Sequence, residues 1–112
     1  MSDLHFRSKG EGHFQVGGSL TFETVHGIWE QSREEITAAA TPRVDLGEVT
    51  EVDSGGLALV LEWLAWAQAQ GKSLTLSHIP GKLMDLARIS EVAELLDGES
   101  GKSSGEDSPG DQ

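Results

Sequence analysis

The feature that most constrains this chain is a strand-like stretch that passes through a tight polar turn into a long apolar helix. Residues 44–49 favour a strand, Asp53-Ser54-Gly55-Gly56 makes the turn, and residues 57–70 are mostly strong helix formers. A second strand-like stretch follows at residues 72–77. Strand, helix and strand in this order make a parallel pair joined by a right-handed crossover, so the sequence predicts an α/β protein.

The other predicted elements complete a mixed sheet. Residues 4–7 and 13–16 alternate apolar with polar side chains on either side of a glycine-rich turn, which predicts an antiparallel hairpin. Helices are predicted from Thr21 to about Ala40, from Pro80 to about Ser90, and from Val92 to Leu96. We therefore expect an α/β sandwich with a mixed four- to five-stranded sheet and helices packed mainly on one face. The helix of residues 57–70 is apolar on nearly every side and is expected to be the central one.

Length and charge narrow the classes of function. The 112 residues fit one domain, expected at residues 1–96, and residues 97–112 contain no large apolar side chain, which predicts a disordered acidic tail. The net charge of −11 disfavours direct binding to nucleic acid or anionic lipid. No apolar run reaches the length of a membrane span, and the first residues lack the pattern of a secretory signal. A cytoplasmic protein without a membrane span is predicted.

The turn has a physical interpretation of its own. A carboxylate or hydroxyl at the head of a helix can accept hydrogen bonds from free backbone amides, so Asp53 or Ser54 could simply cap the helix. The two glycines would let another backbone approach and leave the Ser54 hydroxyl uncovered. Ser54 is therefore expected at an exposed, electropositive helix end, where an added phosphate would meet favourable amides. Such a site suits either a contact with a partner or a switch.

The segment from Val44 through Asp53-Ser54-Gly55-Gly56-Leu57 resembles the signature of STAS domains, the family of anti-sigma-factor antagonists and sulfate-transporter tails. The resemblance spans about residues 14–96 and implies a STAS-like sandwich that binds a protein partner and is not an enzyme. Within the family, Gly-Gly-Leu-Ala-Leu together with Ile28-Trp29-Glu30 is most similar to the STAS subunits of Mla-type phospholipid ABC transporters. The implied partner is then the transporter's ATPase subunit and, through it, the membrane permease, which would place the chain at the inner membrane. The resemblance implies these partner-binding residues: Asp53, Ser54, Gly55, Gly56, Leu57 and Trp29.

Two other functions stay open. STAS domains of the anti-sigma-factor antagonist class are switched by phosphorylation, and Ser54 is the matching candidate phosphorylation site. Against this, Gly18-Ser19-Leu20-Thr21 stands where those antagonists usually carry Gly-Glu/Asp-Leu-Asp. The second alternative is a small-ligand carrier that uses an apolar pocket between helices.

The remaining candidates favour structural roles. Trp29 could contact a partner or pack against the sheet, whereas Trp63 and Trp66 are expected in an interhelical core. The paired acids Glu34-Glu35 are typical of a solvated helix face, and the Gly55-Gly56 turn lacks the lysine of a phosphate-binding loop. The histidines fall in different elements without the spacing of a metal site: His5, His13, His26 and His78. We expect no cofactor, no bound metal and no catalytic residues.

Overall fold

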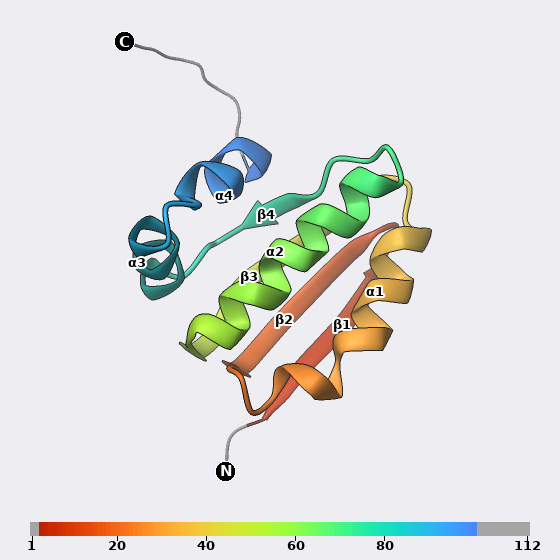
Figure 1. Ribbon diagram of the computed structural model, residues 1–112. Helices are drawn as coiled ribbons and strands as arrows, with labels where there is room; N and C mark the ends of the chain where they lie inside the picture. Colours follow the sequence, from red (N-terminus) through yellow and green to blue (C-terminus); the bar gives the residue numbers. More distant parts are fainter. Residues whose placement is uncertain (1–2, 101–112) are drawn as a thin grey trace, which may run out of the picture.

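The chain forms one four-stranded sheet with helices layered against it, as seen in a computed structural model that describes residues 3–100 (Figure 1). The elements in chain order are β1 (Leu4–Gly10), β2 (His13–Leu20), the 3₁₀ turn η1 (Val25–Gly27), α1 (Trp29–Ala38), β3 (Arg43–Val52), α2 (Ser54–Ala69), β4 (Thr75–Ser77), α3 (Gly81–Ile89) and α4 (Ala93–Ser100).

The sheet is mixed, as predicted. Its strand order is β1-β2-β3-β4, with β1 antiparallel to β2 and both remaining pairs parallel. Phe14 pairs with Val44, and Val44 pairs with Leu76, so apolar side chains line up across the three parallel strands. Because β2 and β3 run in the same direction, Leu20 and Val52 lie side by side where both strands end. The head of α2 follows directly from that edge.

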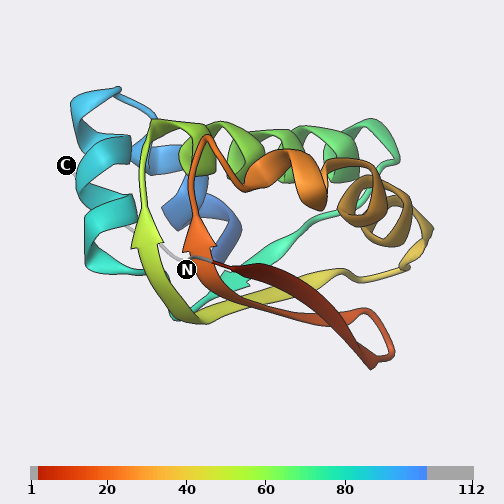
Figure 2. The same cartoon turned by 90° about the horizontal axis from the view of Figure 1, so that it is seen from below.

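The helices lie on one face of the sheet, which confirms the predicted layering (Figure 2). Alternating side chains of the strands point into the core, among them Phe6, Val16 and Leu46. The central helix α2 contributes the following buried side chains: Leu57, Leu59, Val60, Trp63 and Ala67. Helices α1 and α3 both contact α2, which makes α2 the central helix, as its sequence predicts, while an outer stripe that includes Ala58 and Glu62 stays exposed.

The first helix begins later than the sequence suggests. We predicted it from Thr21, but the α-helix starts at Trp29, after the separate 3₁₀ turn η1. The Thr24 hydroxyl donates to the Ser19 carbonyl at 2.5 Å, and the Thr24 and Val25 amides both donate to the Thr21 carbonyl at 3.0 Å. These bonds fold residues 21–25 into a tight turn, because threonine hydroxyls compete well with helical hydrogen bonds.

The carboxyl-terminal part also differs in its boundaries. Strand β4 covers only Thr75–Ser77, a shorter strand than the predicted residues 72–77. Helix α4 runs to Ser100, four residues past the predicted end at Leu96, so the first part of the predicted tail is helical in its backbone. The rest of the predicted tail, residues 101–112, lies outside the described residues. Within residues 3–100, no helix combines the length and the apolar character needed to cross a bilayer.

Candidate functional site

The head of α2 is capped by Asp53. One carboxylate oxygen, Oδ1, accepts hydrogen bonds from the amides of Gly55 at 2.8 Å and Gly56 at 3.2 Å. The same oxygen accepts a third bond, at 2.9 Å, from the amide of Phe22 in the segment between β2 and η1. Asp53 therefore both starts the helix and ties the neighbouring segment to it.

Ser54 is the first residue of α2 and is exposed, as the sequence predicts. Because Asp53 performs the capping, the Ser54 hydroxyl is available at the surface. One expectation needs correction: the amides of Gly55 and Gly56 are already taken by the Asp53 carboxylate. A phosphate on Ser54 would therefore lie next to a carboxylate and would compete with it for those amides.

The two glycines serve the chain itself. A Cβ on Gly56 would overlap the backbone carbonyl of Leu20, and a Cβ on Gly55 would overlap the backbone of Phe22. We had assigned the glycines to the approach of a second protein, and the structure corrects this: the close backbone is the end of β2 and the residues after it. Glycine is required at both positions because the segment 20–22 crosses the first turn of α2 at contact distance.

Leu57 is a core residue. Its side chain is only 4% exposed and belongs to the main hydrophobic cluster. The sequence placed Leu57 among the partner-binding residues, but a side chain buried to this degree offers almost no surface to a partner. Leu57 lies one turn into α2 and packs into the core, whereas Ser54 lies at the open end of the helix and stays exposed.

Trp29 and Trp66 form a half-buried aromatic pair between α1 and α2. Their ring centroids lie 5.8 Å apart at an interplanar angle of 80°, the edge-to-face arrangement that aromatic rings prefer. The Trp29 ring packs between the helices and still reaches the surface, and its contact with a partner stays a prediction. Trp63 is fully buried, as predicted, whereas Trp66 is more exposed than the predicted interhelical core position.

Sequence reasoning missed Phe22. Its side chain is 67% exposed, and its backbone is bonded to Asp53 and packed against Gly55. Phe22 falls on the same helical spacing as Val25 and Trp29, so periodicity points to a buried helix face and gives no sign that the ring is exposed. An isolated aromatic between Thr21 and Glu23, just after an apolar strand end, is the only hint that the sequence carries. The structure therefore adds a large apolar side chain to the surface around Ser54.

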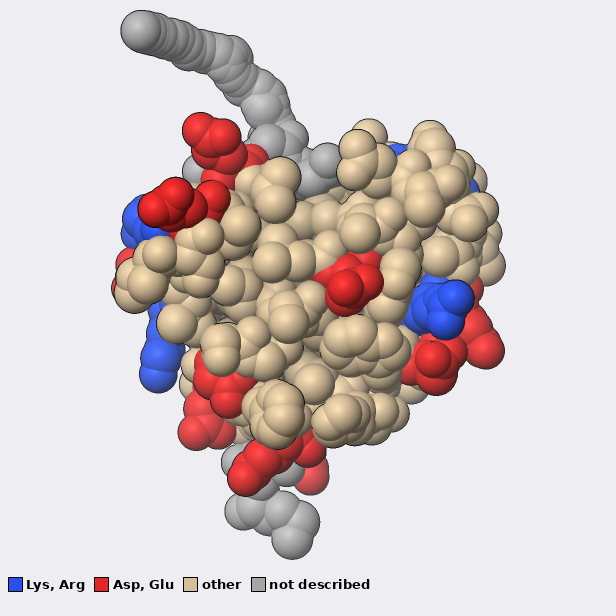
Figure 3. Space-filling view, in the orientation of Figure 1, with Lys and Arg blue, Asp and Glu red and all other residues tan. Residues whose placement is uncertain are grey.

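The face of the molecule that α1 and α2 cover is poor in charge. Figure 3 shows mainly uncharged atoms over these helices, with Asp and Glu side chains gathered around the rim and near the centre. The exposed acids include Glu30 of α1, Glu62 of α2 and Glu23, which precedes η1. A mainly uncharged face with a few acids and a charged border is compatible with a protein–protein contact surface.

Ser19 and Thr21 stand where anti-sigma-factor antagonists usually carry acids, and here both have structural roles. Ser19 is 4% exposed, and its hydroxyl donates to Oε1 of Glu51 at 2.7 Å, across the β2–β3 pair. Thr21 is part of the tight turn that precedes η1, and its amide donates to the Thr24 hydroxyl at 3.0 Å. Both residues fix the backbone that leads to Phe22.

The histidines have separate neighbours. His5 lies 3.8 Å from Glu48, His13 contacts Arg43 at 2.9 Å, and His26 lies edge-on to the Phe22 ring. Asp45 accepts a bond from the Gly47 amide at 2.8 Å and contacts His78 at 3.0 Å. These contacts, the Gly47 amide first and His78 second, hold the pKa of Asp45 below its usual value against the opposing effect of burial. No group of three or more His, Asp or Glu that could hold a metal occurs in the described part of the chain.

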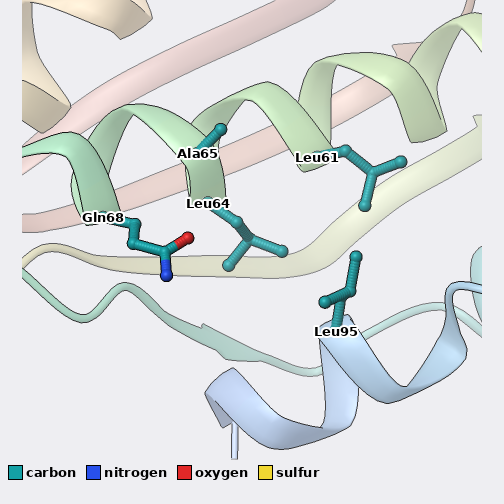
Figure 4. Close-up of a pocket in the computed structure, with 5 residues that line it drawn as sticks. All are labelled: Leu61, Leu64, Ala65, Gln68 and Leu95. Carbon is teal, nitrogen blue, oxygen red and sulfur yellow. The ribbon is translucent and has the colours of Figure 1, made fainter.

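A shallow apolar groove lies between α2 and α4. Figure 4 shows Leu61, Leu64 and Gln68 of α2 directed toward the side of α4 and Leu95, and Ala65 completes the lining. The groove volume is about 160 Å³, below the roughly 300 Å³ at which pockets for drug-sized ligands begin. It could take a small apolar group but offers little enclosure for a lipid, so it gives weak support to a carrier function.

The comparisons with known proteins identify the family of the chain. The family profile described as "Mlab, STAS domain" matches residues 4–97, which is nearly all of the chain that the structure describes. The chain belongs to the STAS family. Its strand, Asp-Ser-Gly-Gly turn and buried helix are the STAS signature that the sequence resembles, and the α/β architecture with its mixed sheet is consistent with the STAS fold.

Two curated relatives have the same name. The chain is 36% identical over 74 residues to the intermembrane phospholipid transport system binding protein MlaB of Escherichia coli K12. It has the same identity over the same length to MlaB of Shigella flexneri. Each match covers 66% of this chain and 74% of the relative. These STAS relatives are named for a phospholipid transport system, which directs the functional proposal.

Proposed function

We propose that this STAS domain is a non-enzymatic accessory subunit of a Mla-type phospholipid ABC transporter, and that it binds and stabilises or regulates the ATPase subunit. The exposed Ser54 at the capped head of α2 is the observation that carries the proposal. The names of the relatives supply the transport system. In this proposal the chain works in the cytoplasm and reaches the membrane permease only through the ATPase.

Three properties of the surface support docking at this place. Asp53 fixes the helix start without help from a partner, so the surface exists before binding. The neighbouring face over α1 and α2 is mainly uncharged apart from a few acids, and it includes the half-buried Trp29. A preformed surface of this kind loses little conformational entropy when a partner binds.

The test measures capture of the transporter's purified ATPase subunit by the wild-type chain and by Ser54→Glu. We expect wild-type capture and its loss in Ser54→Glu, because the new carboxylate brings an unpaired charge into the contact. The variant should fold normally, since position 54 is exposed and an acid in the first turn of a helix is favourable. Ser8→Glu is the matched control, because it adds the same charge on an exposed position of β1.

The anti-sigma-factor antagonist alternative gives a different result. It expects a kinase to add one phosphate to Ser54, seen by mass spectrometry, and expects the phosphate to abolish binding to an anti-sigma factor. Ser54 is exposed enough for a kinase to reach. Full capture of the ATPase by a folded Ser54→Glu variant would contradict the proposed docking site.

A further inference from the structure

Phe22 is an exposed aromatic side chain that the fold of this chain does not explain. Among residues 3–96, the large apolar side chains that remain exposed are Phe22 at 67%, Ile89 at 79% and Leu95 at 53%. Ile89 lies on α3 and Leu95 on α4, whereas Phe22 lies beside Ser54. A single exposed apolar side chain is common on protein surfaces, but this ring is held beside a candidate docking residue, and its burial against a partner would be favourable.

The backbone under Phe22 is held in place from two sides. Its amide donates to Oδ1 of Asp53 at 2.9 Å, the same atom that caps α2 through Gly55 and Gly56. Its Cα packs directly against Gly55, where a side chain could not fit. The ring is therefore presented from a fixed backbone position relative to Ser54, and binding through it requires little ordering of the segment.

The tight turn after Phe22 adds to this rigidity. The amides of Thr24 and Val25 both donate to the Thr21 carbonyl at 3.0 Å. The His26 ring lies edge-on to the Phe22 ring, with centroids 6.0 Å apart, and supports one side of it. The other side of the ring is open to solvent, which leaves an aromatic surface for a second protein.

Charge around Phe22 is acidic. Glu23 is its exposed chain neighbour, and Glu51 is exposed near the end of β3, one residue before Val52 at the same sheet edge. The chain as a whole carries a net charge of −11. A partner that matches this surface needs an apolar cavity for the ring and basic side chains around that cavity.

We propose that Phe22 is the apolar anchor of the Ser54 surface, and that the partner protein receives its ring in an apolar pocket bordered by Lys or Arg. The inference rests on the proposed function for the identity of the partner, the ATPase subunit. Ser54 then provides the close, uncharged contact at the helix head, and Phe22 provides most of the apolar burial. Large aromatic side chains in central, desolvated positions are the usual hot spots of protein interfaces.

The experiment is isothermal titration of the purified ATPase subunit with the wild-type chain, with Phe22→Ala and with the control Ile89→Ala. We expect Phe22→Ala to weaken binding at least about 30-fold, the Kd change that corresponds to a hot-spot residue. Ile89→Ala removes an equally exposed apolar side chain from α3 and should bind as the wild type does. Both variants should keep the wild-type circular dichroism spectrum and unfolding temperature, because both side chains are exposed.

A salt series tests the basic border of the pocket. Raising sodium chloride from about 0.1 M to about 0.5 M shortens the screening length by roughly half, so association with a basic partner should slow markedly. An association rate that does not change with salt would contradict the proposed Lys or Arg side chains around the pocket.

The remaining outcomes separate the possible failures. A wild-type chain that does not bind the ATPase would overturn the proposed function, and this proposal with it. Wild-type binding together with equally tight binding by Phe22→Ala would overturn the anchor alone and leave the proposed function standing. A wild-type dimer on gel filtration that Phe22→Ala dissociates would show that the ring is buried against a second copy of the chain, which also contradicts the proposal.

Discussion

Replacing Asp53 should destabilise the whole domain, because one carboxylate oxygen holds both the helix head and the preceding segment. In Asp53→Ala the amides of Gly55, Gly56 and Phe22 lose their shared acceptor. Loss of a helix N-cap costs about 1 kcal/mol. A hydrogen bond to a charged group in a partly solvated position adds about 1 kcal/mol more. The expected total is about 2 kcal/mol, or an unfolding temperature lower by roughly 8–16 °C for a domain of this size.

The measurement is thermal and urea unfolding followed by circular dichroism. Asp53→Asn should lose about half as much stability, since the amide oxygen still accepts hydrogen bonds but carries no charge. Asp85→Ala is the matched control because it also removes one negative charge: Asp85 is an exposed residue whose ion pair with Arg88 joins adjacent turns of α3. Its effect should stay within about 0.5 kcal/mol. An Asp53→Ala variant with the same unfolding temperature and urea midpoint as Asp85→Ala would refute the reasoning.

Two further substitutions and one control test the packing of the fold. Gly56→Ala should destabilise the fold although alanine is the better helix former, because the new Cβ would overlap the Leu20 carbonyl. In the control Gly81→Ala the added Cβ meets nothing, so this variant should be more stable by about 0.4–1 kcal/mol. Urea unfolding measures the stability of both variants. Ser32→Ala should cost about 1–3 kcal/mol, because it leaves the buried Trp63 indole N–H without the acceptor that now lies at 2.9 Å. An unchanged urea midpoint in Ser32→Ala would show that this hydrogen bond contributes no net stability.

Much of the fold could be predicted because its signals are local and repeated. The alternation in β1 and β2, the uniformly apolar α2 and the position of the Asp-Ser-Gly-Gly turn each follow a known spacing. Together with the handedness of crossover connections they fix the mixed sheet and the helical layer. The exposure of Ser54 at the start of α2 also agrees with the prediction, because Asp53 takes the capping role and leaves the Ser54 side chain at the open helix end.

The errors arose where tertiary contacts decide the outcome. The sequence shows that Gly55 and Gly56 allow a close approach, but only the folded chain shows that residues 20–22 make it. In the same segment, Thr21 and Thr24 form a tight turn where the sequence predicts the start of a helix. This turn also leaves Phe22 at the surface, where no periodic pattern could have placed it. Leu57 was misassigned because a family motif records which residues recur together and not which of them reach the solvent.

The shared oxygen of Asp53 also determines how Ser54 could respond to a phosphate. With about −1.5 to −2 charges, a phosphate on Ser54 would compete with the carboxylate for the Gly55 and Gly56 amides. If it displaced Asp53, the amide of Phe22 would lose its acceptor as well, because all three bonds end on Oδ1. If it did not, it would add its charge beside a carboxylate on the surface that a partner must cover. In both cases the proposed docking would be opposed, so the proposal requires a free hydroxyl at Ser54 together with Asp53 in its capping position.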